Sequence, residues 1–210
     1  MSQVIDALKW RYATKKFNPN EKLSERKLTV LKEAFDLTAT SFGLQPLRLV
    51  VVHDKKMQQS LVTASMGQQQ VADASHLLVF CIETKVDRAF VEAYFENVKA
   101  IRKTPDDVLN PFRTYLLDVF DKESEENTKI WATKQAYLAM GNLLTICAFE
   151  EIDACPMEGF DAAGYDKILG LANHGLASVL VMPIGYRADD DVFAGFKKVR
   201  KGSINTVLEL

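Results

Sequence analysis

The segment covering residues 125–149 constrains the fold more than any other, because it carries a long helical pattern that is apolar over most of its circumference. Its large apolar residues are Trp131, Leu138, Leu143 and Ile146, and small residues stand between them at positions 132, 136, 139 and 141. A helix that is apolar on several sides has to be buried on several sides. The pattern therefore predicts a helix that packs both at the centre of its own subunit and at a subunit interface.

Three short runs rich in valine, leucine and other apolar residues predict buried strands, at residues 47–53, 76–83 and 178–186. One helical pattern precedes these runs, following the cap residue Ser24 and ending near Thr38. Two more lie between the second and third runs, one covering residues 85–103 and an aromatic one following Pro111. Strands that alternate with helices indicate an α+β fold or a three-layer α/β/α arrangement. The last residues, 204–210, alternate like a strand that needs a sheet edge for pairing.

Composition places the chain among ordinary globular proteins. With 210 residues, 48% hydrophobic and 26% charged, it has the size of one domain covering residues 1–210. A net charge of -2 gives no attraction for nucleic acid, and no apolar run reaches the roughly 20 residues of a membrane span. The first residues are too polar for a signal peptide, so the cytoplasm is the expected location. An odd number of cysteines argues against a disulfide framework, and Cys81 and Cys147 are expected to be buried thiols.

Several common site motifs are missing from the sequence. Neither G-x-G-x-x-G after a strand nor G-x-x-x-x-G-K-[ST] occurs, so a Rossmann site and a P-loop are not supported. The three histidines are scattered singly, without the spacing of a zinc site, so no metal is expected. The G-x-S-x-G nucleophile elbow is also absent, which leaves hydrolase chemistry without support.

What remains is a set of cations near the two ends of the chain: Arg11, Lys15, Lys198 and Arg200. Guanidinium groups bind phosphate oxygens in pairs, whereas an ammonium group acts as a point charge. Flavin mononucleotide (FMN) fits this division, with its phosphate at the arginines and a lysine at the electron-rich ring. A turn at residues 156–159 could offer a backbone N–H, because glycine permits close approach. The simpler alternatives are a cation that complements a helix C-terminus and a solvated basic turn.

Six fragments together resemble the nitroreductase family of FMN-dependent NAD(P)H oxidoreductases, nearest to its oxygen-insensitive nitroreductase and dihydropteridine reductase branch. The fragments are residues 11–15, 38–46, 73–76, 134–142, 156–161 and 198–200. The resemblance spans the whole chain. It implies a three-layer α/β/α fold with a mixed, mostly antiparallel sheet, and a homodimer with two FMN sites at the subunit interface. The C-terminal tail is then expected to pair with the partner subunit.

The resemblance also implies roles for individual residues. Arg11, Lys198 and Arg200 would hold the FMN phosphate, Lys15 would lie at the pyrimidine edge, and the Glu158 and Gly159 backbone would face the ring near N5. Further residues expected to border the cofactor are Tyr12, Ala13, Gln70, Pro156 and Met157, with Thr40, Ser41 and Gly43 from the partner subunit. Residues expected near the substrate are Ser41, Phe42 and Tyr115.

The sequence departs from the family pattern at several of these positions. Ala13 replaces a hydroxyl residue, and Tyr12 stands where a basic residue or histidine is common. Gly43 replaces an asparagine, Phe42 adds bulk near the substrate, and Gln70 replaces a lysine of the nearest relatives.

The family's mechanism is ping-pong: NADH or NADPH gives a hydride to the flavin and leaves, and a small-molecule oxidant then takes two electrons in the same cleft. No side chain is needed as an acid or base. The expected acceptors are nitroaromatics, quinones or related conjugated compounds. A dedicated flavin or pteridine reductase is a second hypothesis. A flavin-binding or anion-binding dimer without efficient turnover is a third, suggested by Ala13 and Phe42.

Overall fold

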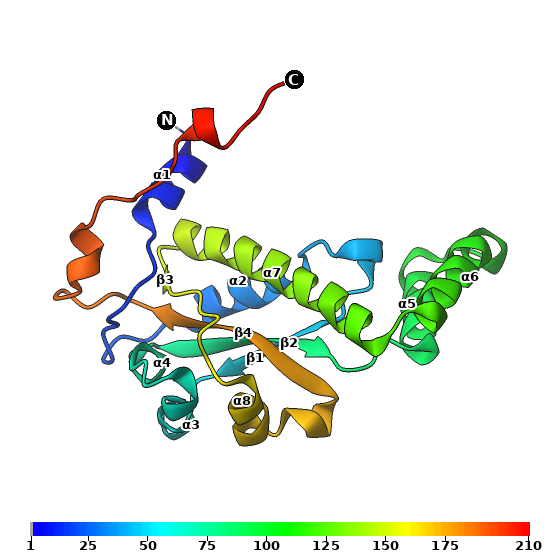
Figure 1. The fold of residues 1–210 in the computed structure, drawn as a ribbon, viewed down its shortest axis with the longest axis horizontal. Coiled ribbons are helices and arrows are strands. Elements are labelled where there is room, and N and C mark those ends of the chain that lie inside the picture. Colours follow the sequence, from blue (N-terminus) through cyan, green and yellow to red (C-terminus); the bar gives the residue numbers. More distant parts are fainter. Residues whose placement is uncertain (1) are drawn as a thin grey trace.

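The computed structural model describes residues 2–210 and arranges them around a sheet whose order is β1-β2-β4-β3 (Figure 1). The strands are β1 (Leu47–Val52), β2 (His76–Glu83), β3 (Asp153–Ala154) and β4 (Leu176–Gly185). The helices are α1 (Gln3–Trp10), α2 (Glu25–Asp36), α3 (Lys55–Leu61), α4 (Gln70–Asp73), α5 (Arg88–Arg102), α6 (Asp106–Lys122), α7 (Glu125–Phe149) and α8 (Ala162–Leu169). Short 3-10 turns are Ser41–Gly43, Thr63–Ser65, Leu171–His174, Val192–Gly195 and Ser203–Asn205.

The sheet lies between two helical layers, as Figure 1 shows: α2 and α7 cover one face, and α3, α4 and α8 cover the other. Alternation along β2 explains how both faces are buried, because successive side chains of a strand point to opposite sides. Leu78, Phe80 and Ile82 pack with the α2 and α7 layer, whereas the alternate residues at 77, 79 and 81 pack with the other layer. The three-layer prediction is therefore confirmed.

All strand pairs in this sheet are antiparallel. The parallel pairing that a mixed sheet requires occurs as an isolated bridge between Ala13 and Ala154. This bridge attaches the N-terminal segment beside β3. Strand β1 pairs with β2 through a register that places Val50 opposite Val79. Its other side has no strand partner within the described residues, so β1 is an edge strand.

Helix α7 has the bounds that the sequence predicts. The side chain of Ser124 caps it by accepting a hydrogen bond from the Asn127 backbone N–H at 3.1 Å. Ala132, Ala136 and Ala139 are fully buried against the sheet layer, because small side chains permit close approach. On the other side Tyr137 is 47% exposed and Leu138 is 55% exposed. One face of α7 thus forms the subunit core, and an apolar strip of it remains on the surface.

Helices α5 and α6 form a pair at one end of the sheet, with a core of their own (Figure 1). The predicted aromatic helix was expected to follow Pro111, but α6 begins at Asp106 and continues through the proline. Proline removes one backbone hydrogen bond from a helix interior. Buried Leu109, Leu116 and Leu117 hold α6 against α5, which explains why the helix persists.

The predicted strand at residues 204–210 is not formed within one chain. The structure has a 3-10 turn at Ser203–Asn205, and the apolar side chains of Ile204, Val207 and Leu208 are exposed. Helix α1 also exposes apolar side chains, and Figure 1 shows that it leaves the sheet on the same side as the C-terminal segment. Both ends of the chain therefore present apolar surface away from the subunit core.

Cys81 and Cys147 are free and buried, as predicted, and Cys155 is buried as well. No helix within residues 2–210 is long and apolar enough to cross a membrane. The same residues contain no cluster of three or more histidine, cysteine, aspartate or glutamate side chains that could hold a metal ion.

His76 at the start of β2 gives a first testable prediction. Its Nδ1 lies 2.8 Å from Ser75 Oγ, and the Ser75 hydroxyl also accepts a hydrogen bond from the Leu23 backbone N–H. Burial, and then the nearby His53, lower the pKa of His76 from 6.5 to about 4. The unfolded chain therefore binds a proton more readily than the folded one, and stability is lost as the pH falls from about 6.5 towards 4.

We expect the free energy of unfolding of the wild-type protein to contain a His76 contribution of up to about 3 kcal/mol that is present at pH 7 and absent at pH 4. Urea unfolding of His76→Gln between pH 7 and pH 4 should show a correspondingly flatter pH dependence. The exposed His174 provides the matched control, His174→Gln, which should keep the wild-type slope. Parallel curves for wild type and His76→Gln would contradict the assignment.

Candidate functional site

Two segments far apart in the sequence lie side by side at the β3 and β4 edge of the sheet. Residues 13–18 follow α1, and residues 186–200 follow β4. Backbone hydrogen bonds connect them: the Asn18 N–H donates to the Tyr186 carbonyl at 2.8 Å, and the Ala188 N–H donates to the Lys16 carbonyl at 2.9 Å. These contacts bring together cations that the sequence places near opposite ends of the chain.

Arg11, Lys198 and Arg200 form a cluster, which we call the cation cluster. The Lys198 ammonium donates a hydrogen bond to the Arg11 carbonyl. Burial, and then the positive charge of Arg200, lower the pKa of Arg11. Burial, and then Arg11 and Arg200, lower the pKa of Lys198 in the same way.

The cation cluster has no carboxylate to balance it. Among residues 2–210, none of its three side chains forms an ion pair with an aspartate or glutamate. Mutual repulsion disfavours the charged forms of neighbouring cations, and a bound anion relieves it. The cluster therefore has the electrostatics of an anion site, and arginine in particular suits phosphate.

A second group of contacts stabilises the backbone around the cation cluster. The Arg187 guanidinium forms an ion pair with buried Asp153, with 2.6 Å between Nη2 and Oδ1. Its Cζ also lies 4.4 Å from the ring centroid of Trp10 and 4.7 Å from that of Tyr12. Tyr12 in turn donates a hydrogen bond to Asp191 at 2.8 Å. Tyr12 thus contacts Asp191 and Arg187 beside the cation cluster, and its expected contact with the cofactor stays a prediction.

Lys15 lies next to the start of the predicted 156–159 turn. Its Nζ is 3.7 Å from the Sγ of Cys155, and Cys155 is fully buried. Burial raises the pKa of the Cys155 thiol, and the Lys15 charge opposes that rise. The Lys15 ammonium therefore lies beside the residue that precedes Pro156.

The 156–159 turn is attached to the sheet and to the segment around α4. The Met157 backbone N–H donates to the Val181 carbonyl at 2.9 Å. The Gln68 side chain donates to the Gly159 carbonyl at 2.9 Å, and the buried Gln70 side chain reaches Met157 Sδ at 3.9 Å. Gln70 therefore lies beside the turn, and its expected contact with the cofactor stays a prediction.

The backbone N–H groups of Glu158 and Gly159 have no acceptor within the described part of the chain. The interaction of the Tyr137 hydroxyl with the Glu158 carboxylate, and then burial, raise the pKa of Tyr137. A Cβ atom at Gly159 would meet nothing closer than 3.8 Å. Packing within the chain does not require glycine there, so the turn offers two donors and room for close approach.

The 40–43 loop lies against α7 and the α5–α6 pair, and among residues 2–210 no hydrogen bond or ring contact joins it to the cation cluster. The Ser41 backbone N–H donates to the Gln135 side chain at 2.9 Å, and the Thr40 hydroxyl accepts from the Gln45 N–H. Gly43 has φ +72°, and a Cβ there would lie 3.1 Å from the Tyr94 hydroxyl. Both observations explain why glycine occupies position 43.

Phe42 is the centre of an aromatic cluster. It adopts φ 60°, which is unusual for a bulky residue. Its ring centroid lies 6.4 Å from each of the rings of Phe112, Phe120 and Trp131. Tyr115 stacks on Phe112 at 6.3 Å and is 54% exposed. The structure therefore groups two of the three expected substrate residues, Phe42 and Tyr115, through a shared neighbour.

Sequence reasoning missed the residues that hold these parts together, which are Gln68, Tyr137, Asp153, Arg187 and Asp191. Each forms its contact with a residue distant in the chain, and no local pattern marks such a pairing.

Comparisons of the sequence and of the structure with known proteins find nitroreductases in both cases. A sequence profile described as the Nitroreductase family matches residues 8–186. YfkO of Bacillus subtilis strain 168, which carries an NAD(P)H nitroreductase name, is 33% identical over 201 residues, covering 90% of this chain and 90% of YfkO. The oxygen-insensitive NAD(P)H nitroreductase of Salmonella typhimurium strain LT2 is 29% identical over 216 residues, covering 99% of each chain.

Solved structures agree with this assignment at the level of the fold. YdfN of B. subtilis superposes with a TM-score of 0.86 at 20% identity, covering 98% of each chain. A nitroreductase from Exiguobacterium sibiricum in complex with FMN superposes with a TM-score of 0.85 at 19% identity, covering 100% of this chain and 98% of the other. Because the profile spans most of the chain and the sequence relatives cover nearly all of it, the chain belongs to the nitroreductase family.

Proposed function

We propose that this chain is an FMN-dependent NAD(P)H oxidoreductase that reduces nitroaromatics, quinones or related conjugated acceptors by two electrons in a ping-pong reaction. The observation that carries the proposal is the cation cluster, which forms no ion pair with a carboxylate among residues 2–210. Lys15 and Arg11 both lie close enough to Cys155, which precedes the 156–159 turn, for their charges to oppose the rise in the pKa of its thiol. The names of the sequence relatives and the FMN in a structural relative support the same activity.

The residues fit the parts of FMN. Arg11, Lys198 and Arg200 would hold the phosphate, because guanidinium groups match its oxygens and the cluster lacks an anion. Lys15 would place its charge at the pyrimidine edge of the ring, next to Gln70. The free N–H groups of the 156–159 turn would face the ring near N5. Bound FMN supplies the hydride chemistry, and these side chains bind and orient it.

The aromatic cluster around Phe42 supports the proposal that the acceptors are flat, conjugated molecules. Aromatic side chains bind such molecules by stacking and by edge-to-face contact. Ser41, Phe42 and Tyr115 would line the substrate side of the cleft. A dedicated flavin or pteridine reductase would use the same cofactor contacts, and only the acceptor preference separates it from a broad nitroreductase.

We further propose a homodimer of single-domain subunits, in which Thr40, Ser41 and Gly43 of each subunit border the cofactor of the other. The exposed apolar strips of α1 and α7 support this assembly. The unpaired edge of β1 supports it as well, because a long uncovered edge strand is a site for pairing with another chain.

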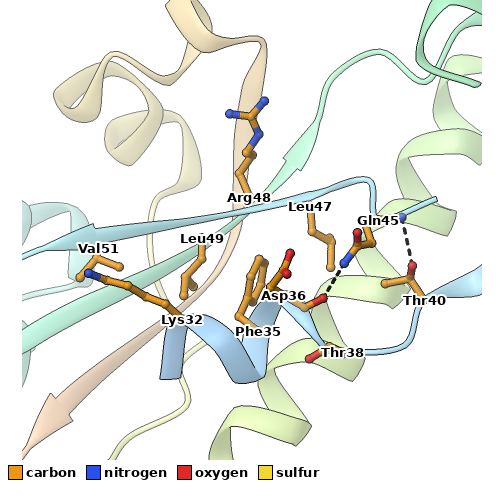
Figure 2. A pocket seen from close by; sticks show the side chains of 10 residues that line it. All are labelled: Lys32, Phe35, Asp36, Thr38, Thr40, Gln45, Leu47, Arg48, Leu49 and Val51. Atoms are coloured by element: carbon orange, nitrogen blue, oxygen red, sulfur yellow. Dashed lines mark hydrogen bonds between the residues drawn. The ribbon is translucent and has the colours of Figure 1, made fainter. Parts of the chain in front are cut away.

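A groove of about 430 Å³ lies along this edge, between β1 and α2. Figure 2 shows its lining, in which Phe35, Leu47 and Leu49 provide apolar surface and Gln45 bonds to Asp36 and Thr40. We assign the groove to the C-terminal tail of the partner subunit. The alternating apolar residues of that tail are exposed in the single chain, and the apolar lining of the groove would bury them.

Purification without added flavin, followed by anaerobic titration with NADPH and NADH, tests the proposed activity. We expect the absorption spectrum of oxidised flavin, its bleaching by one or both donors, and its recovery when a quinone is added. Turnover only with free flavin or pteridine as the acceptor would favour the hypothesis of a dedicated reductase. A colourless protein that takes up no added FMN would overturn the proposal in favour of the dimer without turnover.

Glu158→Gln distinguishes the backbone of the turn from its carboxylate. We expect the FMN dissociation constant to change by less than about threefold, because the amide oxygen can still accept from Tyr137 and the backbone N–H groups are unchanged. Fluorescence titration measures the constant. Complete loss of FMN binding in a folded variant would show that the carboxylate itself is needed.

A further inference from the structure

We propose that Asp191 is a positioning residue that sets the distance between the two halves of the cation cluster and thereby determines affinity for a phosphate-bearing flavin. The inference rests on the proposed function, since it assumes that the cluster binds the FMN phosphate. It assigns to Asp191 a role that no sequence motif indicates.

The contacts of Asp191 carry the argument. Its Oδ2 accepts hydrogen bonds from the Tyr12 hydroxyl at 2.8 Å, the Lys15 backbone N–H at 3.0 Å and the Lys16 backbone N–H at 3.2 Å. Its Oδ1 accepts from the Phe193 backbone N–H at 3.1 Å. One carboxylate therefore joins the segment after α1 to the segment that leads to the C-terminal cations.

The Asp191 side chain that makes these contacts is buried. Asp191 is only 5% exposed, although most of its neighbours in the chain are on the surface. Burial by itself would raise the pKa of the carboxyl, but the hydrogen bonds from Tyr12, Lys15 and Lys16 outweigh it and the net pKa is lowered. The group is thus held as a carboxylate, the form that can accept all four bonds.

The position of Asp191 explains what it does for the cluster. Arg11 immediately precedes the residues bonded to Oδ2, and Lys198 and Arg200 follow the 3-10 turn that Oδ1 caps. Besides burial, the charge of Arg200 lowers the pKa of Arg11, and the charges of Arg11 and Arg200 lower that of Lys198, so like charges lie close together across the two segments. A negative, buried anchor between the two segments opposes their repulsion without neutralising the cations themselves, so they stay available for phosphate.

Asp191→Asn tests the role, because asparagine has the same shape but presents an N–H₂ group on one side and carries no charge. Titrations of the apoprotein with FMN and with riboflavin, which lacks the phosphate, separate positioning of the cations from general damage. We expect the dissociation constant for FMN to rise about tenfold or more and that for riboflavin to change by less than about threefold. The neighbouring Asp190 is exposed, and among residues 2–210 its one ion pair is with Lys16, so Asp190→Asn is the matched control and should leave both constants near wild type.

Tyr12→Phe keeps the test decisive if Asp191→Asn does not fold, because it removes one of the four bonds and leaves the carboxylate. It should weaken FMN binding about two- to fivefold, again without a matching effect on riboflavin. If the wild type prefers FMN and the variants keep the wild-type ratio of the dissociation constants for FMN and riboflavin, the role of Asp191 is overturned and the phosphate assignment stands. A wild type that binds both flavins equally would overturn the phosphate assignment of the cation cluster, and the role of Asp191 with it.

Discussion

Arg200→Ala is expected to raise the dissociation constant for FMN by about ten- to a hundredfold, because a hydrogen bond to a charged group contributes about 1.5–3 kcal/mol and 1.4 kcal/mol corresponds to a factor of ten. In the structure Arg200 lies close enough to lower the pKa of Arg11, and its Nη1 donates only to the carbonyl of the preceding Val199. Its remaining donors are therefore available to a phosphate.

Fluorescence titration of the apoprotein at two salt concentrations measures this effect. Arg200→Lys should fall between wild type and alanine, since lysine keeps the charge but loses the paired donors. Lys201→Ala is the matched control: it removes an adjacent exposed cation, and a change of less than about twofold is expected. Equal losses in Arg200→Ala and Lys201→Ala would mean that the segment acts only through its total charge, and wild-type affinity in Arg200→Ala would remove Arg200 from the phosphate site.

The elements that the sequence predicts most accurately are those whose side chains are buried on more than one side. Strand β2 and helix α7 have the predicted bounds, because an unbroken apolar run and a helical pattern with small residues each leave one arrangement that buries them. Strand β3 has only two residues and no pattern of its own, so pairing with β4 alone defines it. Helix α6 continues through Pro111 for the same kind of reason, since packing against α5 outweighs the local preference.

Part of the candidate site could likewise be predicted from the sequence and part could not. Residue chemistry indicates the cations, and the family resemblance points to the turn at 156–159, but neither shows what brings Arg11 to within contact of Lys198. That depends on Asp191 and Arg187, whose partners lie far away in the chain. The grouping of Phe42 with Phe112, Phe120 and Trp131 was also beyond the sequence, because helical periodicity gives the face of a side chain and not its neighbours on other elements.

Removal of residues 202–210 is expected to convert the proposed dimer into monomers while leaving the fold of each subunit intact. The tail forms no strand and exposes Ile204, Val207 and Leu208 in the single chain. Full burial of an aliphatic side chain contributes about 1.5–3 kcal/mol, so two exchanged tails would supply several such contributions before the cost of ordering them. Arg200 and Lys198 remain in the truncated chain, which separates assembly from phosphate binding.

Sedimentation velocity over a range of protein concentrations measures the change, and FMN titration of the same samples follows its consequence. Because Thr40, Ser41 and Gly43 of one subunit are proposed to border the cofactor of the other, monomers should bind FMN more weakly than wild type even with an intact cation cluster. Leu208→Asp should reproduce much of the effect by placing a charge where an apolar contact is needed, whereas its neighbour Glu209→Gln should remain dimeric. A truncated protein that stays dimeric at the wild-type concentration would show that the surfaces of α1 and α7 hold the subunits together, and that the groove beside β1 belongs to something other than the tail.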